Sequence, residues 1–192
     1  MQKVFEADRY LFQLVNNKWS NPYFDTLMPL VRNANFWIPL YLFLLVFALF
    51  NIPKSGWFIL FVVCTAALTD VLSSHIIKNH IFRLRPCQDP SLIGTIRVLA
   101  SYCPQSSSFT SSHAANHFGL ATFASVTLYR YAGKWIYLTY LWAFLIIYAQ
   151  LYVGVHYPID VFCGALLGVM AGLLTAWIYQ KKWAGPNLDN QI

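Results

Sequence analysis

Three short polar motifs lie at the ends of long apolar stretches, and each contains residue types that can bind or transfer a phosphate. The first motif contains Lys78, Arg83, Arg85 and Pro86. The spacing of seven residues predicts that Lys78 and Arg85 share one helix face, two turns apart, with Pro86 ending the helix. A planar guanidinium and a compact ammonium held together suit a phosphate. In a simpler interpretation, these are basic residues that snorkel and anchor the helix end.

The second motif is a hydroxyl-rich segment, residues 106–112, followed by His113. We expect Ser111 to cap a helix that starts there, so that its free N–H groups and its dipole form an anion site. His113 in the first turn would face that anion. Ordinary capping beside an interfacial histidine explains the same residues.

The third motif places His156 and Asp160 four residues apart, on either side of Pro158. Proline suits the opening of a helix, and an acidic residue suits its first turn. Asp160 can therefore reach one ring nitrogen of His156, fix its tautomer and free the other nitrogen for attack. A structural His–Asp pair that joins two helices is the alternative.

The elements that must position these motifs are membrane helices. Hydrophobic residues make up 58% of the 192 residues and charged residues only 10%, a far more apolar balance than that of soluble domains. We predict an all-α bundle of about five spans, near residues 35–52, 56–78, 112–130, 135–154 and 159–181. Counting spans then brings all three motifs to one side of the membrane, where they can form a single phosphate site.

The chain is expected to form one domain over residues 1–192. Residues 1–33 carry too many charges for a span and predict an amphipathic helix at the interface, followed by the bundle at 34–183 and a tail at 184–192. No apolar core of a signal peptide follows Lys3. The net charge of +6 comes from scattered basic residues, which favours anionic lipid headgroups as partners and argues against nucleic acid.

Two further features leave alternatives open. Cys87 and Cys103 share the long loop 86–110, where they can form a disulfide worth about 3 kcal/mol in an oxidising compartment or remain free thiols. Gly164, Gly168 and Gly172 form a smooth stripe that favours close helix packing. The partner is a helix of the same bundle or a second copy of the chain, so the oligomeric state stays open.

The motifs resemble the three signatures of the type 2 phosphatidic acid phosphatase superfamily, which are Lys-x6-Arg-Pro, Pro-Ser-Gly-His and Ser-Arg-x5-His-x3-Asp. The resemblance covers about residues 56–181. The matching residues are Lys78, Arg85, Pro86, Ser111, His113, His156 and Asp160. Four residues depart from the pattern: Thr110 for Pro, Ser112 for Gly, Ala149 for Ser and Gln150 for Arg.

The resemblance implies a lipid phosphatase that needs no metal and no other cofactor. His156 would attack phosphorus, Asp160 would orient it, and His113 would protonate the departing oxygen and later assist water. The phosphoryl oxygens would be held by Lys78, Arg85, Ser111 and the backbone N–H of Ser112, with Gln150 at the place of the family arginine.

Gln150 is the serious departure, because loss of one such donor costs about 10²–10³ in rate. Three explanations compete. Arg83 or Arg97 supplies the missing charge, or Gln150 suffices through hydrogen bonds, or the protein is a weakly active lipid-binding or transport protein.

The resemblance also implies a location and a class of substrate. We expect the cytoplasmic (inner) membrane, with the site on its periplasmic or extracellular side. The substrate would be phosphatidate, phosphatidylglycerol phosphate, undecaprenyl diphosphate or a phosphate of lipid A. The rival functions are a lipid phosphotransferase with the same intermediate and a metal hydrolase that uses His113 and His117.

Overall fold

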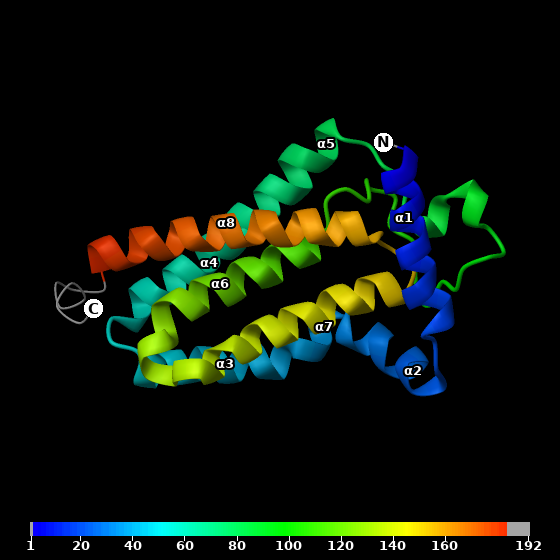
Figure 1. Ribbon diagram of the computed structural model, residues 1–192. Coiled ribbons are helices and arrows are strands. Elements are labelled where there is room, and N and C mark those ends of the chain that lie inside the picture. Colours follow the sequence, from blue (N-terminus) through cyan, green and yellow to red (C-terminus); the bar gives the residue numbers. More distant parts are fainter. Residues whose placement is uncertain (1, 184–192) are drawn as a thin grey trace.

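Long helices lie side by side and a shorter helix crosses one end in the computed structural model, which describes residues 2–183 (Figure 1). Every regular element of that part of the chain is helical, which confirms the predicted all-α class. The predicted tail at 184–192 lies outside the described residues. The long helices are α3 (Ile38–Asn51), α4 (Ser55–Asp70), α6 (Ser112–Ala132), α7 (Leu138–Tyr152) and α8 (Pro158–Trp183).

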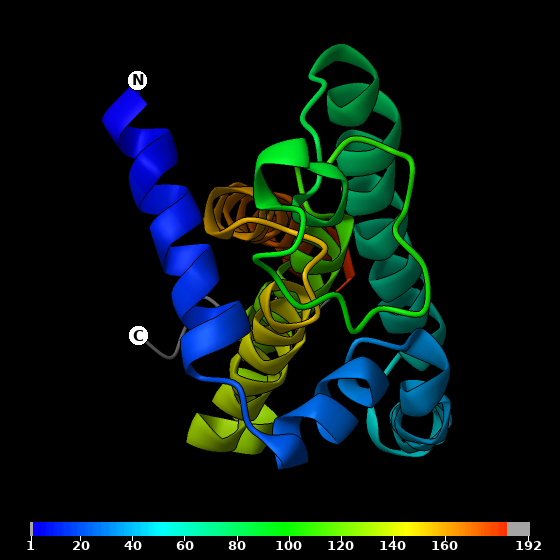
Figure 2. The same ribbon diagram turned by 90° about the vertical axis from the view of Figure 1, so that its right-hand side faces the viewer.

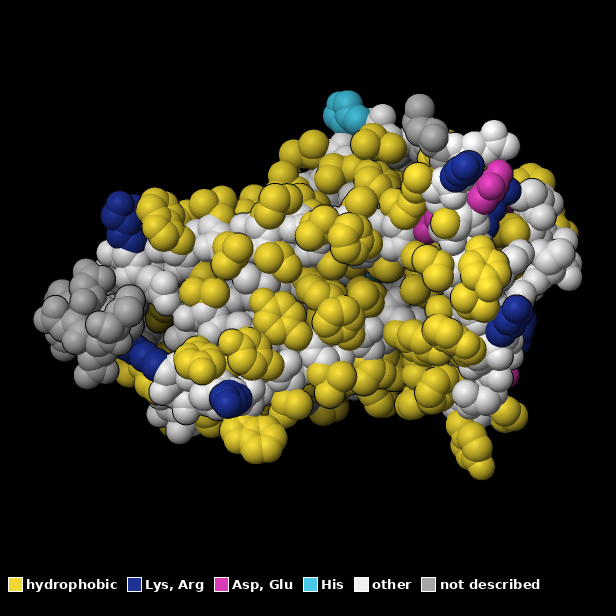
Figure 3. All heavy atoms as spheres, in the orientation of Figure 1, with side chains coloured by type: hydrophobic (Ala, Val, Ile, Leu, Met, Phe, Trp, Pro, Cys, Tyr) yellow, Lys and Arg dark blue, Asp and Glu magenta, His cyan; other side chains and the backbone are white. Residues whose placement is uncertain are grey.

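The apolar helices identify a membrane protein. Four stretches within residues 2–183 are long and apolar enough to span a membrane, namely Ala34–Asn51, Ser55–His80, Ser112–Tyr152 and Pro158–Lys182. The third stretch contains both α6 and α7, joined by a 3-10 turn at Gly133–Tyr137, where the sequence predicted two spans. The number of crossings therefore stays a prediction. Hydrophobic side chains cover the flank of the bundle, and charged side chains gather at its two ends (Figure 3).

The glycine stripe of α8 packs against α6. A Cβ atom on Gly168 would lie 2.3 Å from the carbonyl oxygen of Ala115, and one on Gly172 would lie 2.5 Å from that of Gly119. Only glycine permits this approach of the two backbones. The partner of the stripe is therefore a helix of the same bundle, and the stripe is not available as a homodimer seam.

The N-terminal segment consists of two helices where the sequence predicted one. Helix α1 (Gln2–Gln13) continues through a π-helical turn, and α2 (Pro22–Val31) starts after a break. Asn21 causes the break, because its side chain caps α2 by accepting a hydrogen bond from the N–H of Phe24 at 2.9 Å. Seen from this end, α1 passes beside the start of α8 (Figure 2). Its place at a membrane interface remains a prediction.

The helix that carries Lys78 ends earlier than predicted. Helix α4 continues through the π-helical stretch Val71–Ile77 into α5 (Lys78–His80), and the backbone then becomes extended. The predicted placement of Lys78 and Arg85 on one helix face is therefore wrong. The reason is a remote pairing: the N–H of Arg83 donates to Ser107 Oγ at 3.1 Å, and Arg83 O accepts from the N–H of Ser108 at 2.8 Å.

The segment between α5 and α6 is irregular apart from 3-10 turns at Pro86–Gln88 and Pro90–Leu92. Cys87 and Cys103 form a disulfide within it, so the structure selects the paired alternative. Cys64 and Cys163 are free thiols.

Candidate active site

The three motifs meet at the end of the bundle that α1 crosses. Lys78 Nζ donates to Ser112 Oγ at 2.8 Å, which joins the first motif to the second. The N–H of Ser111 donates to the carbonyl oxygen of Asp160 at 3.1 Å, which joins the second motif to the third. The structure thus brings residues 78, 111–113 and 156–160 to one place. Arg85 joins them from an extended segment and not from the predicted helix.

His156 is buried with its two ring nitrogens in different surroundings. Arg85 Nη1 lies 3.0 Å from His156 Nε2. A guanidinium can only donate, so Nε2 accepts and the ring proton belongs on Nδ1. Nδ1 lies 3.4 Å from Ser108 Oγ and 3.7 Å from Asp160 Oδ2. Nε2 therefore carries the in-plane lone pair of the ring, and that lone pair accepts the hydrogen bond from Arg85.

Burial lowers the pKa of His156 to about 4, because a buried imidazolium would lose its hydration. The carboxylate of Asp160 raises this pKa, and the positive charge of Arg85 lowers it further. The imidazole is therefore neutral at pH 7. A neutral imidazole is the form that can act as a nucleophile.

Asp160 is fully buried and accepts hydrogen bonds on both carboxylate oxygens. Oδ1 accepts from Arg83 Nη1 at 2.6 Å, and Oδ2 accepts from Ser108 Oγ at 2.5 Å and from the N–H of Tyr157 at 2.9 Å. Ser108 thus lies between Asp160 and His156. Sequence reasoning missed this role, because nothing distinguishes Ser108 from the other hydroxyl residues of its segment.

Arg83 lies behind Asp160 and binds a second carboxylate. Its Nη2 is 2.5 Å from Asp8 Oδ2 of α1, and its guanidinium stacks 4.3 Å from the ring centre of Tyr157. Asp8 is also buried and accepts from the N–H of Ile159 at 2.8 Å. This contact was not predictable, because Asp8 lies in a segment with the sequence pattern of an amphipathic helix.

The other proposed auxiliary cation, Arg97, pairs with Asp25. Both candidates for the missing positive charge are thus engaged by aspartates. The structure places neither guanidinium in contact with His156.

Lys78 and Arg85 differ from these two arginines, because neither forms an ion pair with a carboxylate of residues 2–183. Arg85 instead donates to the carbonyl oxygens of Ser106, Ser107 and Val155. Burial lowers its pKa to about 10, and Asp160 opposes this effect. The guanidinium therefore stays charged at neutral pH.

The start of α6 forms another wall of the site. Ser111 caps this helix as predicted, since its Oγ accepts from the N–H of Ala114 at 3.4 Å. His113 follows in the first turn, within electrostatic range of Lys78 and His156. His117 Nδ1 lies 2.7 Å from the carbonyl oxygen of His113, so that nitrogen is occupied by the backbone.

Gln150 is fully buried near the end of α7. Neither its amide nitrogen nor its amide oxygen has a hydrogen-bond partner within residues 2–183. A buried amide without partners costs free energy, so this side chain is suited to gain hydrogen bonds from a ligand or water.

Comparison with known proteins finds a matching family model and similar phosphatases. A family model described as the PAP2 superfamily matches residues 55–184. The chain is 28% identical to a lipid A 4'-phosphatase of Porphyromonas gingivalis, over 97% of this chain and 80% of that protein. It is 29% identical to a lipid A 4'-phosphatase of Bacteroides thetaiotaomicron, over 90% of this chain and 77% of that protein.

Two crystal structures share the fold. LpxE of Aquifex aeolicus superposes with a TM-score of 0.64 at 28% identity, over 86% of this chain and 92% of that one. A PAP2-type phosphatidylglycerolphosphate phosphatase of Bacillus subtilis superposes with a TM-score of 0.73 at 20% identity, over 95% of this chain and 89% of that one.

Proposed function

The chain belongs to the PAP2 superfamily and is a lipid phosphatase, and we propose that it hydrolyses a lipid phosphomonoester through a phosphohistidine intermediate without a metal ion. The observation that carries the proposal is the environment of His156. Its Nε2 carries the in-plane lone pair of a neutral ring and lies 3.0 Å from the guanidinium of Arg85, which forms no ion pair with a carboxylate of residues 2–183. A nucleophile beside an unpaired cation suits attack on an anionic phosphate.

In the first step, Nε2 of His156 forms a bond to phosphorus while the bond from phosphorus to the lipid oxygen breaks. His113 gives that oxygen a proton, which yields the lipid alcohol. The ring of His156 then carries positive charge, which Asp160 stabilises, since Asp160 lies 3.7 Å from Nδ1.

In the second step, water gives a proton to His113 and attacks phosphorus, and the bond from phosphorus to Nε2 breaks. Inorganic phosphate leaves and the imidazole is neutral again. Lys78, Arg85, Ser111, the N–H of Ser112 and the amide of Gln150 stabilise the phosphoryl oxygens in both steps, which is the dominant contribution in phosphoryl transfer.

Lipid A 4'-phosphate is the first substrate to test, because two relatives aligned over most of this chain are named for that activity. Phosphatidate, phosphatidylglycerol phosphate and undecaprenyl diphosphate are the competing substrates. The diphosphate differs from the others in charge and in the bond that is cleaved.

The disulfide supports a site outside the cytoplasm. Cys87 lies two residues after Arg85, so the disulfide loop and the site share one end of the bundle. Disulfides persist in oxidising compartments, which include the bacterial periplasm and the cell surface. We therefore assign the protein to the cytoplasmic membrane with its site on the outer side.

The test is release of inorganic phosphate by the detergent-purified protein from each of the four lipids. We expect release from lipid A, persistence of activity in EDTA and loss of activity in His156→Ala. Loss of activity in EDTA would contradict the mechanism without a metal. Transfer of the phosphoryl group to an added alcohol, with no inorganic phosphate released in its absence, would identify a phosphotransferase. Equal phosphate release by His156→Ala would overturn the proposal.

A further inference from the structure

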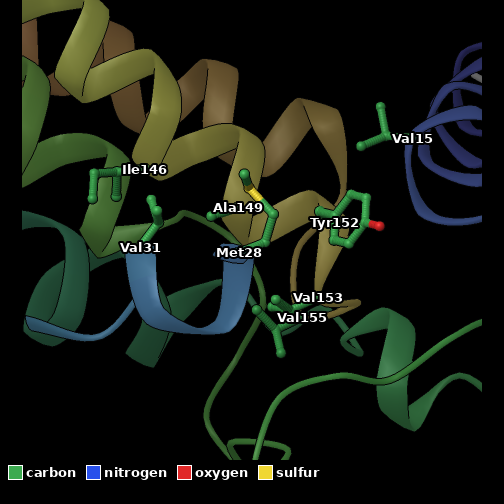
Figure 4. Packing of buried hydrophobic residues seen from close by; sticks show 8 residues of the cluster. All are labelled: Val15, Met28, Val31, Ile146, Ala149, Tyr152, Val153 and Val155. Atoms are coloured by element: carbon green, nitrogen blue, oxygen red, sulfur yellow. The ribbon is translucent and has the colours of Figure 1, made fainter. Parts of the chain in front are cut away.

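Arg32 follows Val31, which packs against the segment of α7 that carries Gln150. It follows the last residue of α2, and its N–H donates to the carbonyl oxygen of Met28 at 3.1 Å. Val31, directly before it, packs in one buried cluster with Ile146 and Ala149 of α7 (Figure 4). Ala149 precedes Gln150, so the end of α2 is anchored next to the position where the family arginine is missing.

Among the described residues, no carboxylate pairs with the guanidinium of Arg32. It forms no hydrogen bond and no ion pair with any of residues 2–183, although it is half-buried. Its positive charge acts on both Arg85 and His113, which places it within electrostatic range of the two sides of the site. Burial of a charge without a partner is unfavourable, and an anion at this place would compensate for it.

The ion pairs divide the arginines at this end of the bundle into two groups. Arg9, Arg83 and Arg97 each bind an aspartate, whereas Arg32 and Arg85 bind none within residues 2–183. Lys78 has no carboxylate partner there either. Three cations that form no ion pair within residues 2–183 match a phosphate dianion better than two such cations do.

We propose that Arg32 is a phosphate-binding residue that supplies the positive charge absent at Gln150. Its guanidinium approaches the phosphoryl group from α2, outside the segment that carries the family motifs, while Gln150 donates only a neutral hydrogen bond. The proposal rests on the proposed function for its role in turnover. The phosphate site itself can be tested without turnover.

The experiment measures two properties of Arg32→Gln. The first is kcat/KM for phosphate release from the lipid, which we expect to fall on the order of 10²-fold. The second is the affinity for inorganic phosphate, measured by calorimetry in the His156→Ala background, which we expect to weaken roughly tenfold, as for one lost charge-assisted hydrogen bond. Arg32→Lys keeps the charge and is expected to retain much of the phosphate affinity.

A second-site rescue makes the test specific. Gln150→Arg combined with Arg32→Gln should recover at least part of both losses, because it restores an arginine at the family position. Arg130→Gln, at the other end of α6, is the matched control and should leave both measurements unchanged. A change in either measurement for Arg130→Gln would show that removing any arginine has this effect.

The outcomes separate this inference from the proposed function. Unchanged phosphate affinity in Arg32→Gln would overturn the role of Arg32. If Arg32→Gln does not fold, Arg32→Met replaces it in the same His156→Ala background, and unchanged phosphate affinity in that variant would overturn the role of Arg32 equally. Absence of lipid turnover in the unmodified protein would refute the proposed function. Loss of phosphate affinity in Arg32→Gln would still support the role of Arg32 in binding phosphate.

Discussion

The guanidinium of Arg83 lies 2.6 Å from Asp160, the carboxylate beside His156. The same guanidinium lies 2.5 Å from Asp8 of α1, so Arg83 connects Asp160 to the N-terminal helix. Phe12 of α1 adds an edge contact to Tyr157, with ring centres 5.5 Å apart. Helix α1 is thus part of the structure that positions the site.

We expect Asp8→Asn to reduce both stability and activity. Removing one partner of a buried ion pair costs about 2–5 kcal/mol, and the freed guanidinium no longer holds Asp160 in place. A small misplacement of a reacting group lowers kcat about 10- to 100-fold, so kcat should fall more than KM rises. Thermal unfolding and steady-state kinetics measure the two effects.

Glu6→Gln is the control for this prediction, because Glu6 is an exposed carboxylate on the same helix. It should leave melting temperature and kcat unchanged. If Asp8→Asn behaves like Glu6→Gln, α1 has no part in positioning Asp160.

The pH dependence of the first chemical step should reflect the low pKa of His156. Protonation of Nε2 abolishes the nucleophile, and the pKa of about 4 means that protonation occurs only in strong acid. The rate of phosphoenzyme formation should therefore persist from pH 7 to about pH 5 and fall below it. The substrate phosphate also titrates in this range. Its ionisation is therefore measured separately by phosphorus NMR, and the pH–rate profile is corrected for it. An acid limb centred near 6.5, the ordinary pKa of histidine, would show that His156 is not held neutral.

The same shift affects stability, because the pKa of His156 is lower in the folded state than in the unfolded chain. Between the two values the unfolded chain binds more protons. Stability from this group is therefore present above about pH 6.5 and is lost as the pH falls toward 4.

Reduction of the Cys87–Cys103 disulfide should destabilise the loop that follows Arg85. The two cysteines are 16 residues apart, and a loop of that size corresponds to about 3 kcal/mol in the chain-entropy model. Cys87→Ser should lower the melting temperature, whereas Cys64→Ser, at a free cysteine, should not. Mass spectrometry without reductant should find residues 87 and 103 joined, and two free thiols there would refute the pairing.

Packing of α8 on α6 should tolerate no side chain at Gly168. An added Cβ would lie 2.3 Å from a backbone oxygen, so Gly168→Ala must push the helices apart at a cost of about 1–3 kcal/mol or more. Gly56→Ala is the matched control, because nothing lies within 4 Å of a Cβ built there. Equal melting temperatures for the two variants would contradict the close packing.

Features that depend on local sequence were predictable. Ser111 caps α6, and Pro158 and Asp160 lie in the first turn of α8, because capping and helix-start preferences act within a few residues. The apolar stretches identified the long helices for the same reason. These helix ends are what bring His113 and His156 to the same end of the bundle.

Features that depend on remote contacts were not predictable. The helix ends at His80 because Arg83 pairs with the backbone and side chains of residues 107 and 108, and spacing alone suggested that it would continue. The partners of Asp160 on Arg83 and Ser108, and the position of Arg32 next to α7, likewise come from segments far apart in the sequence. A single sequence carries no signal for such contacts.

The central claim is that His156 Nε2 becomes covalently phosphorylated during turnover. The most direct measurement is mass spectrometry of the protein quenched under alkaline conditions, which preserve phosphohistidine, within the first turnovers on lipid A. We predict the added mass of one phosphoryl group on the peptide that contains His156, and none in His156→Ala. Phosphate release with no phosphorylated peptide in any quenched sample, or phosphate on another residue, would contradict the account.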